Sequence, residues 1–341
     1  MRARVFDPTS DPPESASGAV LAADVPGTDG HDAFQKGLRL DATHAAALVA
    51  LGRPIHVIDL DPGELEQGTV ALRLAAAVGG PGTRAEPPSQ GQSRVRAAVR
   101  GRLRLRADAV AAVNGLHPLL LFTAADGRVV AEGDDVAGAK SAALATAEAL
   151  LVEAERIARS APVLSVMPFI HRRIGVVVTD RLEPRGRALI HGAIRRKIEW
   201  FGSEMTSFAE VAHETAAVSE VLRQALSSGA DLILLSGGSP LDPIDPVLRA
   251  LETSGGRVER TGVPAHPGSM VWVGSLPTAP VLGIATCAGF GKDTALDLIL
   301  ARVLTGDAPA DAADALGAGG LAEGASPGSP FPPYPRATPA R

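Results

Sequence analysis

Three short apolar runs, each followed by a helix-like pattern, constrain the fold of this chain more than any other feature. The runs share branched side chains and contain almost no polar residue: "IGVVVT" (174–179), "DLILL" (231–235) and "PVLGIAT" (280–286). Runs of this kind are typical of strands that are buried on both faces of a parallel sheet. Between them, apolar residues recur at helical spacing, as Ile190, Ile194 and Ile198 do. Residues 168–306 are predicted to form an α/β domain, with a mostly parallel sheet and helices in three layers.

The predicted order of elements in this domain is strand, helix, helix, strand, helix, strand and helix. The first helix pattern stops at Gly202, and glycine commonly follows the last residue of a helix. The second covers 216–230 and follows with no strand predicted between the two. The last helix pattern lies within 291–306 and repeats leucine, isoleucine and valine on one face.

Residues 1–160 are predicted to form a separate region of mixed α+β structure. The expected elements are helices and strands over short stretches: helices at 43–52, 64–80 and 138–159, and strands at 54–60 and 93–106. The 138–159 helix is expected to lead into the second domain. Gly, Ala and Pro dominate 307–341, so this stretch is predicted to be a disordered tail.

Composition and charge exclude several classes of function. The net charge of the 341 residues is −5, which provides no strong basic field for nucleic acid. The alternating arginines of 93–106 fit the solvated face of a strand, and a local basic patch stays open as the alternative. A single cysteine, Cys287, excludes a disulfide framework and fits a reducing compartment. No apolar run reaches the roughly 20 residues of a membrane span, so we expect a cytoplasmic protein.

The loop "SGGSPLDPID" (236–245) follows the second apolar run and precedes a helix pattern. Its candidate ligand-binding residues are small or acidic: Ser236, Gly237, Gly238, Ser239, Asp242 and Asp245. Glycine amides before a helix bind anions, and the hydroxyls add donors. The carboxylates favour a ligand with phosphate and polar donors, such as a pterin or purine, or a phosphate bridged by Mg²⁺. Asp245 before Pro246 is also a good helix N-cap, and the two roles are compatible.

Two further loops follow the other apolar runs. "TDRLEPRGR" (179–187) contains Asp180 and Glu183, and "ATCAGFGKD" (285–293) contains Gly289 and Lys292. Ligands of open α/β sheets bind at the carboxyl ends of the strands, so the three loops are expected to meet at one edge. Lys292 would neutralise a phosphate there, although a solvated lysine in a first helical turn is the common alternative.

These loops, in their strand–helix context, resemble the molybdopterin-binding domain of molybdenum cofactor biosynthesis proteins and gephyrin. The resemblance rests on "SGGSPLDPIDPVLRAL", "GVPAHPGSM" and "VLGIATCAGFGKDTALDLILARVLTG". The N-terminal half is similar to the opening region of a prokaryotic subgroup related to the molybdenum insertases. The resemblance covers most of residues 18–306.

The resemblance implies a ligand: molybdopterin, its adenylated form or the molybdenum cofactor. Carried over by motif, Ser236–Ser239 and Asp245 form the ligand loop, and Asp180, Glu183, Gly289 and Lys292 belong to the two neighbouring loops. Asp242 matches an acidic position of the subgroup. In an insertase-like molybdotransferase reaction, Asp242 and Asp245 would be catalytic and would hold Mg²⁺. The family also implies a homo-oligomer, with molybdoenzymes or other cofactor-biosynthesis proteins as partners.

Two departures from the family pattern leave the reaction open. The first loop has Asp180 where the family usually shows glycine after the threonine, and Ala285 stands where proline is common. Binding is the primary interpretation. A non-catalytic scaffold or carrier of the same fold, and a Mg²⁺-dependent nucleotide pyrophosphatase, are the alternatives.

Overall fold

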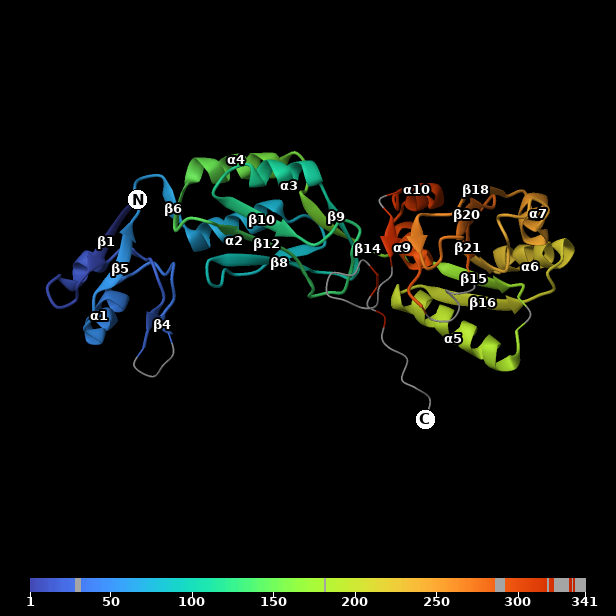
Figure 1. Ribbon diagram of the computed structural model, residues 1–341, viewed down its shortest axis with the longest axis horizontal. Coiled ribbons are helices and arrows are strands. Elements are labelled where there is room, and N and C mark those ends of the chain that lie inside the picture. The colour runs from blue at the N-terminus through green and yellow to red at the C-terminus, as the bar shows by residue number, and fades with distance from the viewer. Residues whose placement is uncertain are drawn as a thin grey trace. The chain divides into compact units, whose positions relative to one another are not determined.

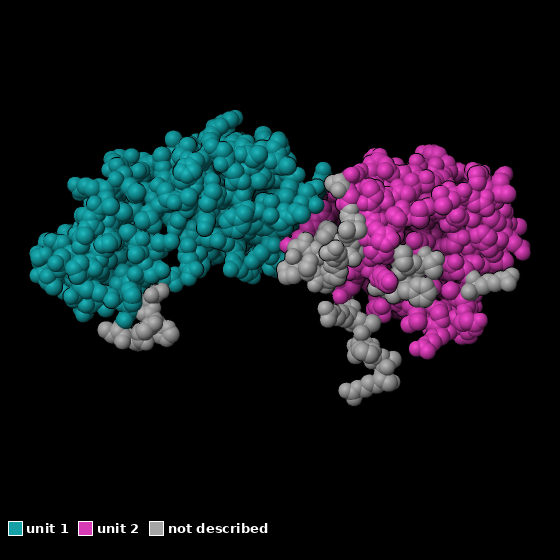
Figure 2. All heavy atoms as spheres, viewed as in Figure 1, with its two compact units in different colours: residues 1–99, 103–126, 132–166 teal, residues 100–102, 127–131, 167–341 magenta. Residues whose placement is uncertain are grey.

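The chain divides into two compact units with separate buried cores. The computed structural model describes residues 1–27, 32–180, 182–285, 292–317, 319–321, 331–332 and 334. Unit 1 comprises 1–99, 103–126 and 132–166, and unit 2 comprises 100–102, 127–131 and 167–341 (Figure 2). Within the described ranges, no helix has the length and apolar character needed to cross a membrane.

Unit 2 is built on a six-stranded sheet with the order β16–β15–β17–β21–β20–β18 (Figure 1). Its strands are β15 (Arg173–Val178), β16 (Glu204–Glu210), β17 (Leu232–Ser236), β18 (Arg257–Thr261), β20 (Trp272–Ser275) and β21 (Pro280–Ile284). β15 pairs in parallel with β16 and β17, and β17 pairs in parallel with β21. β20 and β18 add two antiparallel pairings at the other side. The three apolar runs are the three central parallel strands.

Helices cover both faces of this sheet, which makes three layers. The helices are α5 (Pro184–Trp200), α6 (Thr215–Ser227), α7 (Pro246–Thr253), α9 (Ala295–Val303) and α10 (Pro309–Asp314). Successive side chains of a strand point to opposite faces. Val176 and Val178 accordingly belong to the core cluster of α5, α9 and α10, whereas Val177 belongs to that of α6 and α7. The α/β fold class predicted from the sequence is observed.

The apolar stripe of α5 shows why this segment is a helix. Ile190, Ile194 and Ile198 recur every four residues and are at most 2% exposed. Burial of each contributes about 1.5–3 kcal/mol to stability. The helix ends at Trp200 with Phe201 as its C-cap, and Gly202 follows at φ +76°, as the sequence predicted for a glycine past a helix end.

Strand β16 was not predicted. The predicted order therefore had two consecutive helices where the structure has a strand between them. All of its residues are exposed or only partly buried. β16 is an edge strand, so its sequence "EMTSFAE" lacks both the continuous apolar run of a central strand and a clean alternation. The two helices are joined through this strand, and the loop after it becomes important below.

Unit 1 contains several small sheets and four α-helices among its described residues. Its N-terminal part holds β1 (Arg2–Phe6), β2 (Val20–Leu21), β5 (Ile55–Asp59), β3 (Val25–Pro26), β4 (Asp32–Phe34), the 3-10 helix η1 (Pro13–Ala16) and α1 (Ala42–Leu51). Its larger sheet has the order β10–β12–β8–β7: β10 (Leu119–Thr123), β12 (Asp135–Ser141), β8 (Gln92–Ala97) and β7 (Thr83–Ala85). The helices of this part are α2 (Gln67–Val78), α3 (Ala107–Asn114) and α4 (Glu148–Arg159). β6 (Glu64–Glu66) pairs with β13 (Ala145–Ala147).

The remaining strands form two small sheets. β9 (Gly101–Leu105) lies between β11 (Val129–Val130) and β14 (Leu164–Pro168), and β19 (Ala265–His266) pairs in parallel with β22 (Gly320–Leu321). The predicted single strand over 93–106 is two strands, β8 and β9.

The helix predicted over 138–159 is wrong for its first part. Residues up to Ser141 belong to β12, residues 145–147 form β13, and only α4 is helical. A Cβ at Gly138 would lie 2.3 Å from the ring of Phe122 on the neighbouring strand β10, so this glycine serves the sheet. Ala139 is held in β12 by antiparallel pairing with β8 and β10, and Ala145 and Ala147 are held in β13 by antiparallel pairing with β6.

Part of the stretch 307–341, which the sequence predicted to be a disordered tail, has regular structure. Residues 309–314 form α10, whose Ala312 and Ala313 are buried in the core of unit 2. Phe331 is buried, and Tyr334 packs against the same core cluster. The composition suggested disorder because small residues bury little area each, but here a preformed apolar surface receives them.

Candidate functional site

Three strands of unit 2 end at the same level, at one edge of the sheet. Val178 of β15 lies opposite Ser236 of β17, and Ser236 lies opposite Ile284 of β21. The chain therefore leaves these strands at a common edge, where the sequence placed its candidate residues. Of the third loop, residues 286–291 lie outside the described part of the chain, and Gly289 with them.

The two adjacent glycines of the second loop are required by packing. Gly237 has φ +97°, and a Cβ there would lie 2.0 Å from the hydroxyl oxygen of Thr179. A Cβ on Gly238 would lie 2.9 Å from a methyl carbon of Val247. Both missing side chains thus face protein atoms, which draws the loop tightly onto the end of β15 and the start of α7. Close contact between these segments fixes the direction of the backbone between them.

Asp245 is the N-cap of α7, in agreement with one of its two predicted roles. Its Oδ1 accepts hydrogen bonds from the amides of Val247 (2.8 Å) and Leu248 (3.4 Å). Its Oδ2 accepts from the amide of Ser239 (3.0 Å) and lies 3.5 Å from Nε2 of His213. The residue is 3% exposed. Three backbone amides bond to its two oxygens and the ring of His213 lies against Oδ2, so the carboxylate faces protein groups and not an open metal site.

Asp242 differs from Asp245, because it lies on the exposed part of the loop. Its Oδ1 accepts from the amide of Ile244 (3.0 Å), and its own amide donates to the carbonyl of Ser239 (3.1 Å). The neighbouring apolar side chains are also exposed, Leu241 by 79% and Ile244 by 67%. The tip of this loop therefore presents one carboxylate between two uncovered apolar groups.

Ser236 and Asp180 hold the first two loops together. The hydroxyl of Ser236, which is 3% exposed, donates to Oδ2 of Asp180 at 2.9 Å. The hydroxyl of Ser239 is on an exposed residue instead. Glu183 is exposed at the N-cap position of α5, with no side-chain hydrogen bond to the helix. Of these four polar residues, Ser239 and Glu183 are the exposed ones.

His213 belongs to this site and was not predicted. It lies between β16 and α6, and its Nδ1 is 3.0 Å from the hydroxyl oxygen of Thr179. Its side chain is 40% exposed. Recognition of β16 as a fourth parallel strand would have placed His213 in a fourth loop at the same edge. That weak strand pattern was the only sequence signal for it.

A buried ion pair contacts Lys292, near the end of the third loop. The ammonium of Lys197 lies 2.7 Å from both carboxylate oxygens of Asp297, and these side chains are 5% and 0% exposed. The same ammonium donates to the carbonyl of Lys292 at 2.6 Å. Asp297 also accepts from the amide of Thr294, which caps α9. The side chain of Lys292 itself is exposed.

Tyr334 completes this cluster. Its hydroxyl donates to Oδ1 of Asp297 at 2.6 Å, and its ring lies 5.3 Å from the ammonium of Lys197. Burial raises the pKa of Tyr334 well above its usual value, and the negative charge of Asp297 adds to the effect. Burial likewise raises the pKa of Asp293, helped by Asp297 and opposed by Lys197. The start of α9 is therefore a compact, charged but enclosed region.

The proline-rich loop before β20 packs on the start of α9. The carbonyl of Pro267 accepts from the amide of Ala295 at 2.9 Å. A Cβ on Gly268 would lie 3.0 Å from Thr294. This loop, which the sequence marked as part of the resemblance, thus supports the segment that follows the third loop.

Metal coordination by the described residues has limited support from the geometry. No group of three or more His, Cys, Asp and Glu side chains within the described ranges is arranged to hold an ion. Asp242 retains an oxygen that accepts no hydrogen bond from a described residue, whereas Asp245 does not. Mg²⁺ in proteins is often held by one carboxylate together with ligand phosphates and water. Asp242 fits that pattern, whereas Asp245 does not.

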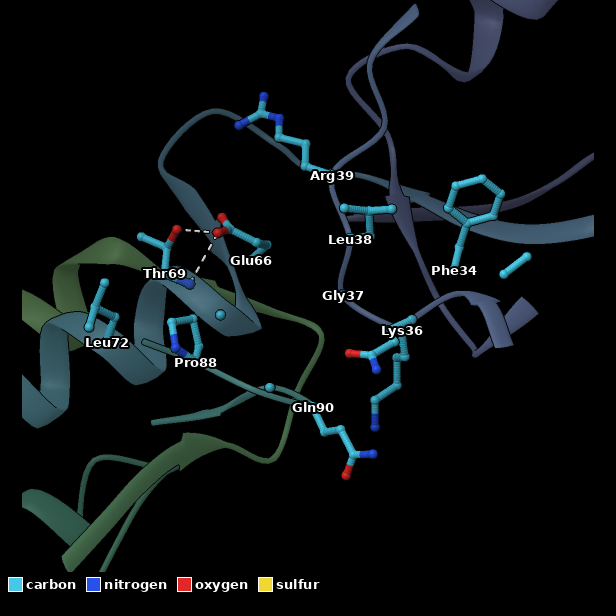
Figure 3. Close-up of a pocket in the computed structure, with 14 residues that line it drawn as sticks. Phe34, Lys36, Gly37, Leu38, Arg39, Glu66, Thr69, Leu72, Pro88 and Gln90 are labelled. Atoms are coloured by element: carbon cyan, nitrogen blue, oxygen red, sulfur yellow. Dashed lines mark hydrogen bonds between the residues drawn. The ribbon is translucent and has the colours of Figure 1, made fainter. Parts of the chain in front are cut away.

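Unit 1 contains an open cavity of about 500 Å³ (Figure 3). Lys36 and Arg39 lie on one side of it, and Glu66 lies on the other, where it accepts from the amide and hydroxyl of Thr69. None of the residues singled out in the sequence lines this cavity. Cations and a carboxylate share its wall, so its charge favours no one class of ligand.

Comparisons with known proteins give limited similarities. No family model and no curated protein matches the chain. Among solved structures, the molybdopterin biosynthesis enzyme MoaB from Thermus thermophilus is 22% identical over 40% of this chain and 98% of its own, with a TM-score of 0.30. The molybdopterin biosynthesis Mog protein from Mycobacterium ulcerans is 17% identical over 39% of this chain and 92% of its own, with a TM-score of 0.29.

A third similar structure extends over both units. The molybdopterin biosynthesis MoeA protein from Pyrococcus horikoshii is 13% identical, covers 92% of this chain and 76% of its own, and has a TM-score of 0.29. At these identities and TM-scores the likeness is slight. The function proposed below rests on the strand-end loops themselves.

Proposed function

We propose that unit 2 binds a phosphorylated pterin of the molybdopterin class, and that the protein acts in the biosynthesis or delivery of the molybdenum cofactor. The observation that carries this proposal is the common edge at which β15, β17 and β21 end, with Gly237 and Gly238 in the loop that follows β17. Backbone amides at such an edge are suited to anionic groups of a ligand. The loop sequence "SGGSPLDPID" adds the motif resemblance to this geometry.

Exposure divides the candidate residues into two groups with different parts in binding. Ser239 and Lys292 are exposed and carry donors, so they would contact the phosphate. Asp242 is an exposed acceptor for ring N–H groups, and Leu241 and Ile244 beside it would cover an apolar ring face. These five residues form the proposed ligand surface.

The buried and half-buried residues keep that surface in place. Asp245 caps α7, and the hydroxyl of Ser236 donates to Oδ2 of Asp180, so these contacts lie within the loops and hold them together. We therefore assign them no contact with the ligand and no step of catalysis. If Mg²⁺ accompanies the phosphate, Asp242 would supply one oxygen ligand, and the ion would neutralise phosphate charge.

The proposal is tested by the pterin that the protein retains. The full chain is produced in cells that make molybdenum cofactor and purified gently, and the bound pterin is oxidised to its fluorescent form and quantified. We expect retention by the wild type. Ser239→Ala and Lys292→Gln should each reduce it about tenfold, because a hydrogen bond to a charged group contributes about 1.5–3 kcal/mol.

A matched control and a contrary outcome sharpen the test. Lys140→Gln removes a lysine from β12 of unit 1 and should leave retention unchanged. Absence of pterin from the wild type, together with Mg²⁺-dependent turnover of a dinucleotide, would contradict the proposal and favour a pyrophosphatase. A stable protein complex with no small molecule bound would favour a scaffold.

A further inference from the structure

His213 contacts the first loop (179–187) and the second loop (236–245). Its Nδ1 lies 3.0 Å from the hydroxyl oxygen of Thr179, which follows β15, and its Nε2 lies 3.5 Å from Oδ2 of Asp245, which precedes α7. We infer that His213 is a positioning residue of the strand-end site, which holds these two loops at a fixed separation. Its effect on ligand binding rests on the function proposed above.

The neighbours of His213 favour one tautomer of its ring, because each can accept or donate only certain hydrogen bonds. A carboxylate oxygen accepts, so the ring must present an N–H from Nε2 towards Asp245. In a neutral ring of that tautomer, Nδ1 carries the lone pair and faces the hydroxyl of Thr179, which can donate either to Nδ1 (3.0 Å) or to the carbonyl of Ser236 (3.2 Å). At 3.5 Å the contact with Asp245 is at the long limit for a hydrogen bond, so the contact with Thr179 is the firmer of the two.

The chain of threonine, histidine and aspartate superficially has the order of a nucleophile, a base and an orienting acid. Burial excludes that role. Thr179 is 4% exposed, and its hydroxyl oxygen lies against Gly237, where even a single added carbon would be 2.0 Å away. A substrate atom cannot approach this oxygen, so the imidazole orients the loops and does not activate a nucleophile.

His213 is linked to the proposed ligand surface through one atom, Oδ2 of Asp245. Oδ2 of Asp245 faces His213 and also accepts from the amide of Ser239, which is part of the proposed ligand surface. Without His213, the amide of Ser239 is the one described partner left to Oδ2, while the amides of α7 still hold Oδ1. Loss of His213 should therefore loosen the Ser239 amide and the end of β15 together.

Hydrogen exchange on the full chain tests the positioning role without any ligand. In His213→Ala, amides near Thr179 and from Ser239 to Asp245 should exchange about fivefold faster, as the loss of one net hydrogen bond implies. His171→Ala is the matched control: its Nδ1 bonds one backbone carbonyl, that of Gly202, and it precedes β15 at the opposite edge of the sheet. It should not change exchange in either loop.

Conservative variants separate positioning from a general loss of structure. His213→Asn places an acceptor near the position of Nδ1 and should restore most of the protection, whereas His213→Gln, which reaches towards Asp245, should restore less. The inference is overturned if faster exchange in His213→Ala is confined to residues adjacent to 213. It is also overturned if His213→Asn exchanges as fast as His213→Ala.

Retained pterin gives a second readout. His213→Ala should retain at least about fivefold less than the wild type, and His213→Asn should recover part of the loss. Unchanged retention in His213→Ala would contradict a role in ligand positioning. A wild type that retains no pterin would count against the proposed function, while hydrogen exchange would still decide the role of His213 in the loops.

Discussion

Two helices of unit 2 begin at the same edge of the sheet, and each has a buried aspartate at its start. Asp245 precedes α7 and is 3% exposed, and Asp297 in α9 is fully buried. Asp297 is paired with Lys197 and accepts from Tyr334. Asp245 is satisfied by three amides of its own segment and faces His213, whose side chain is 40% exposed.

The difference concerns what satisfies each carboxylate. A buried ion pair is enclosed on all sides, because either charge left alone would be costly. Backbone amides satisfy a carboxylate without a buried cation, so the residues around it can remain open to solvent. The first arrangement suits a structural support, and the second suits the floor of a binding site.

The largest effect is expected for Asp297→Ala. Because Lys197 would remain buried without its partner, the free energy of unfolding should fall by about 3–5 kcal/mol, as measured by urea denaturation. Asp311→Ala, at an exposed aspartate in the first turn of α10, should change it little. Adding Lys197→Met to Asp297→Ala should recover much of the loss. A cost below about 1 kcal/mol for Asp297→Ala would remove the contrast between the two carboxylates.

A smaller loss of stability is expected for Asp245→Ala, about 1–2 kcal/mol, because it removes a helix N-cap. Pterin retention should fall as well, since the Ser239 amide loses its partner. Asp41→Ala removes the N-cap of α1 in unit 1 and offers a matched comparison. It should lower stability without changing retention; equal retention in both variants would separate Asp245 from the site.

Tyr334→Phe should lower the unfolding free energy by about 1 kcal/mol, because Asp297 loses one donor and keeps the others. The pKa of Tyr334 is raised in the folded protein, so above pH 10 the unfolded state loses its proton first. Stability of the wild type should therefore fall as pH rises through this range, relative to Tyr334→Phe. Absorbance titration measures the same shift directly. A phenol that titrates near its usual pKa would mean that Tyr334 is not held on Asp297.

The smallest effect is expected for Asp293→Asn. The pKa of Asp293 is raised, so the folded state binds its proton more tightly than the unfolded state does. Its contribution to stability is favourable below the usual pKa of an aspartate and is lost as pH rises through the raised value. The variant should therefore gain slightly in melting temperature relative to wild type between pH 4 and pH 7. The exposed Asp108→Asn gives the reference, and an identical pH profile in both would contradict the assignment.

The parts of this fold that the sequence predicted are those where burial leaves few choices. Continuous branched runs such as "IGVVVT" must be covered on both faces, which placed the central strands of unit 2 and the loops after them. Asp245 before Pro246 predicted an N-cap that the structure contains. The loop "SGGSPLDPID" was singled out correctly as the connection between β17 and α7.

The parts that were missed depend on contacts between distant residues. β16 is a half-exposed edge strand, so neither of the two usual strand patterns identifies it. Gly138 and its alanine neighbours form a strand because Phe122 and β8 lie beside them. His213 acquires its partners only when the loops after β15, β16 and β17 meet. Lys197 and Asp297 are 100 residues apart, and nothing local in either segment predicts their pairing.

The chain has two tryptophans, and one stands beside each of the two carboxylate clusters. The ring of Trp200 lies 5.5 Å from that of Tyr334, and the indole nitrogen of Trp272 lies next to Gly238, 3.4 Å from where a Cβ would be. Replacing either one by phenylalanine leaves a single tryptophan, whose fluorescence reports on one known position. Emission spectra of the two variants would then report separately on the cluster of Lys197, Asp297 and Tyr334 and on the loop that contains Gly238. They would show whether heating or a change of pH disturbs the two regions together or one after the other.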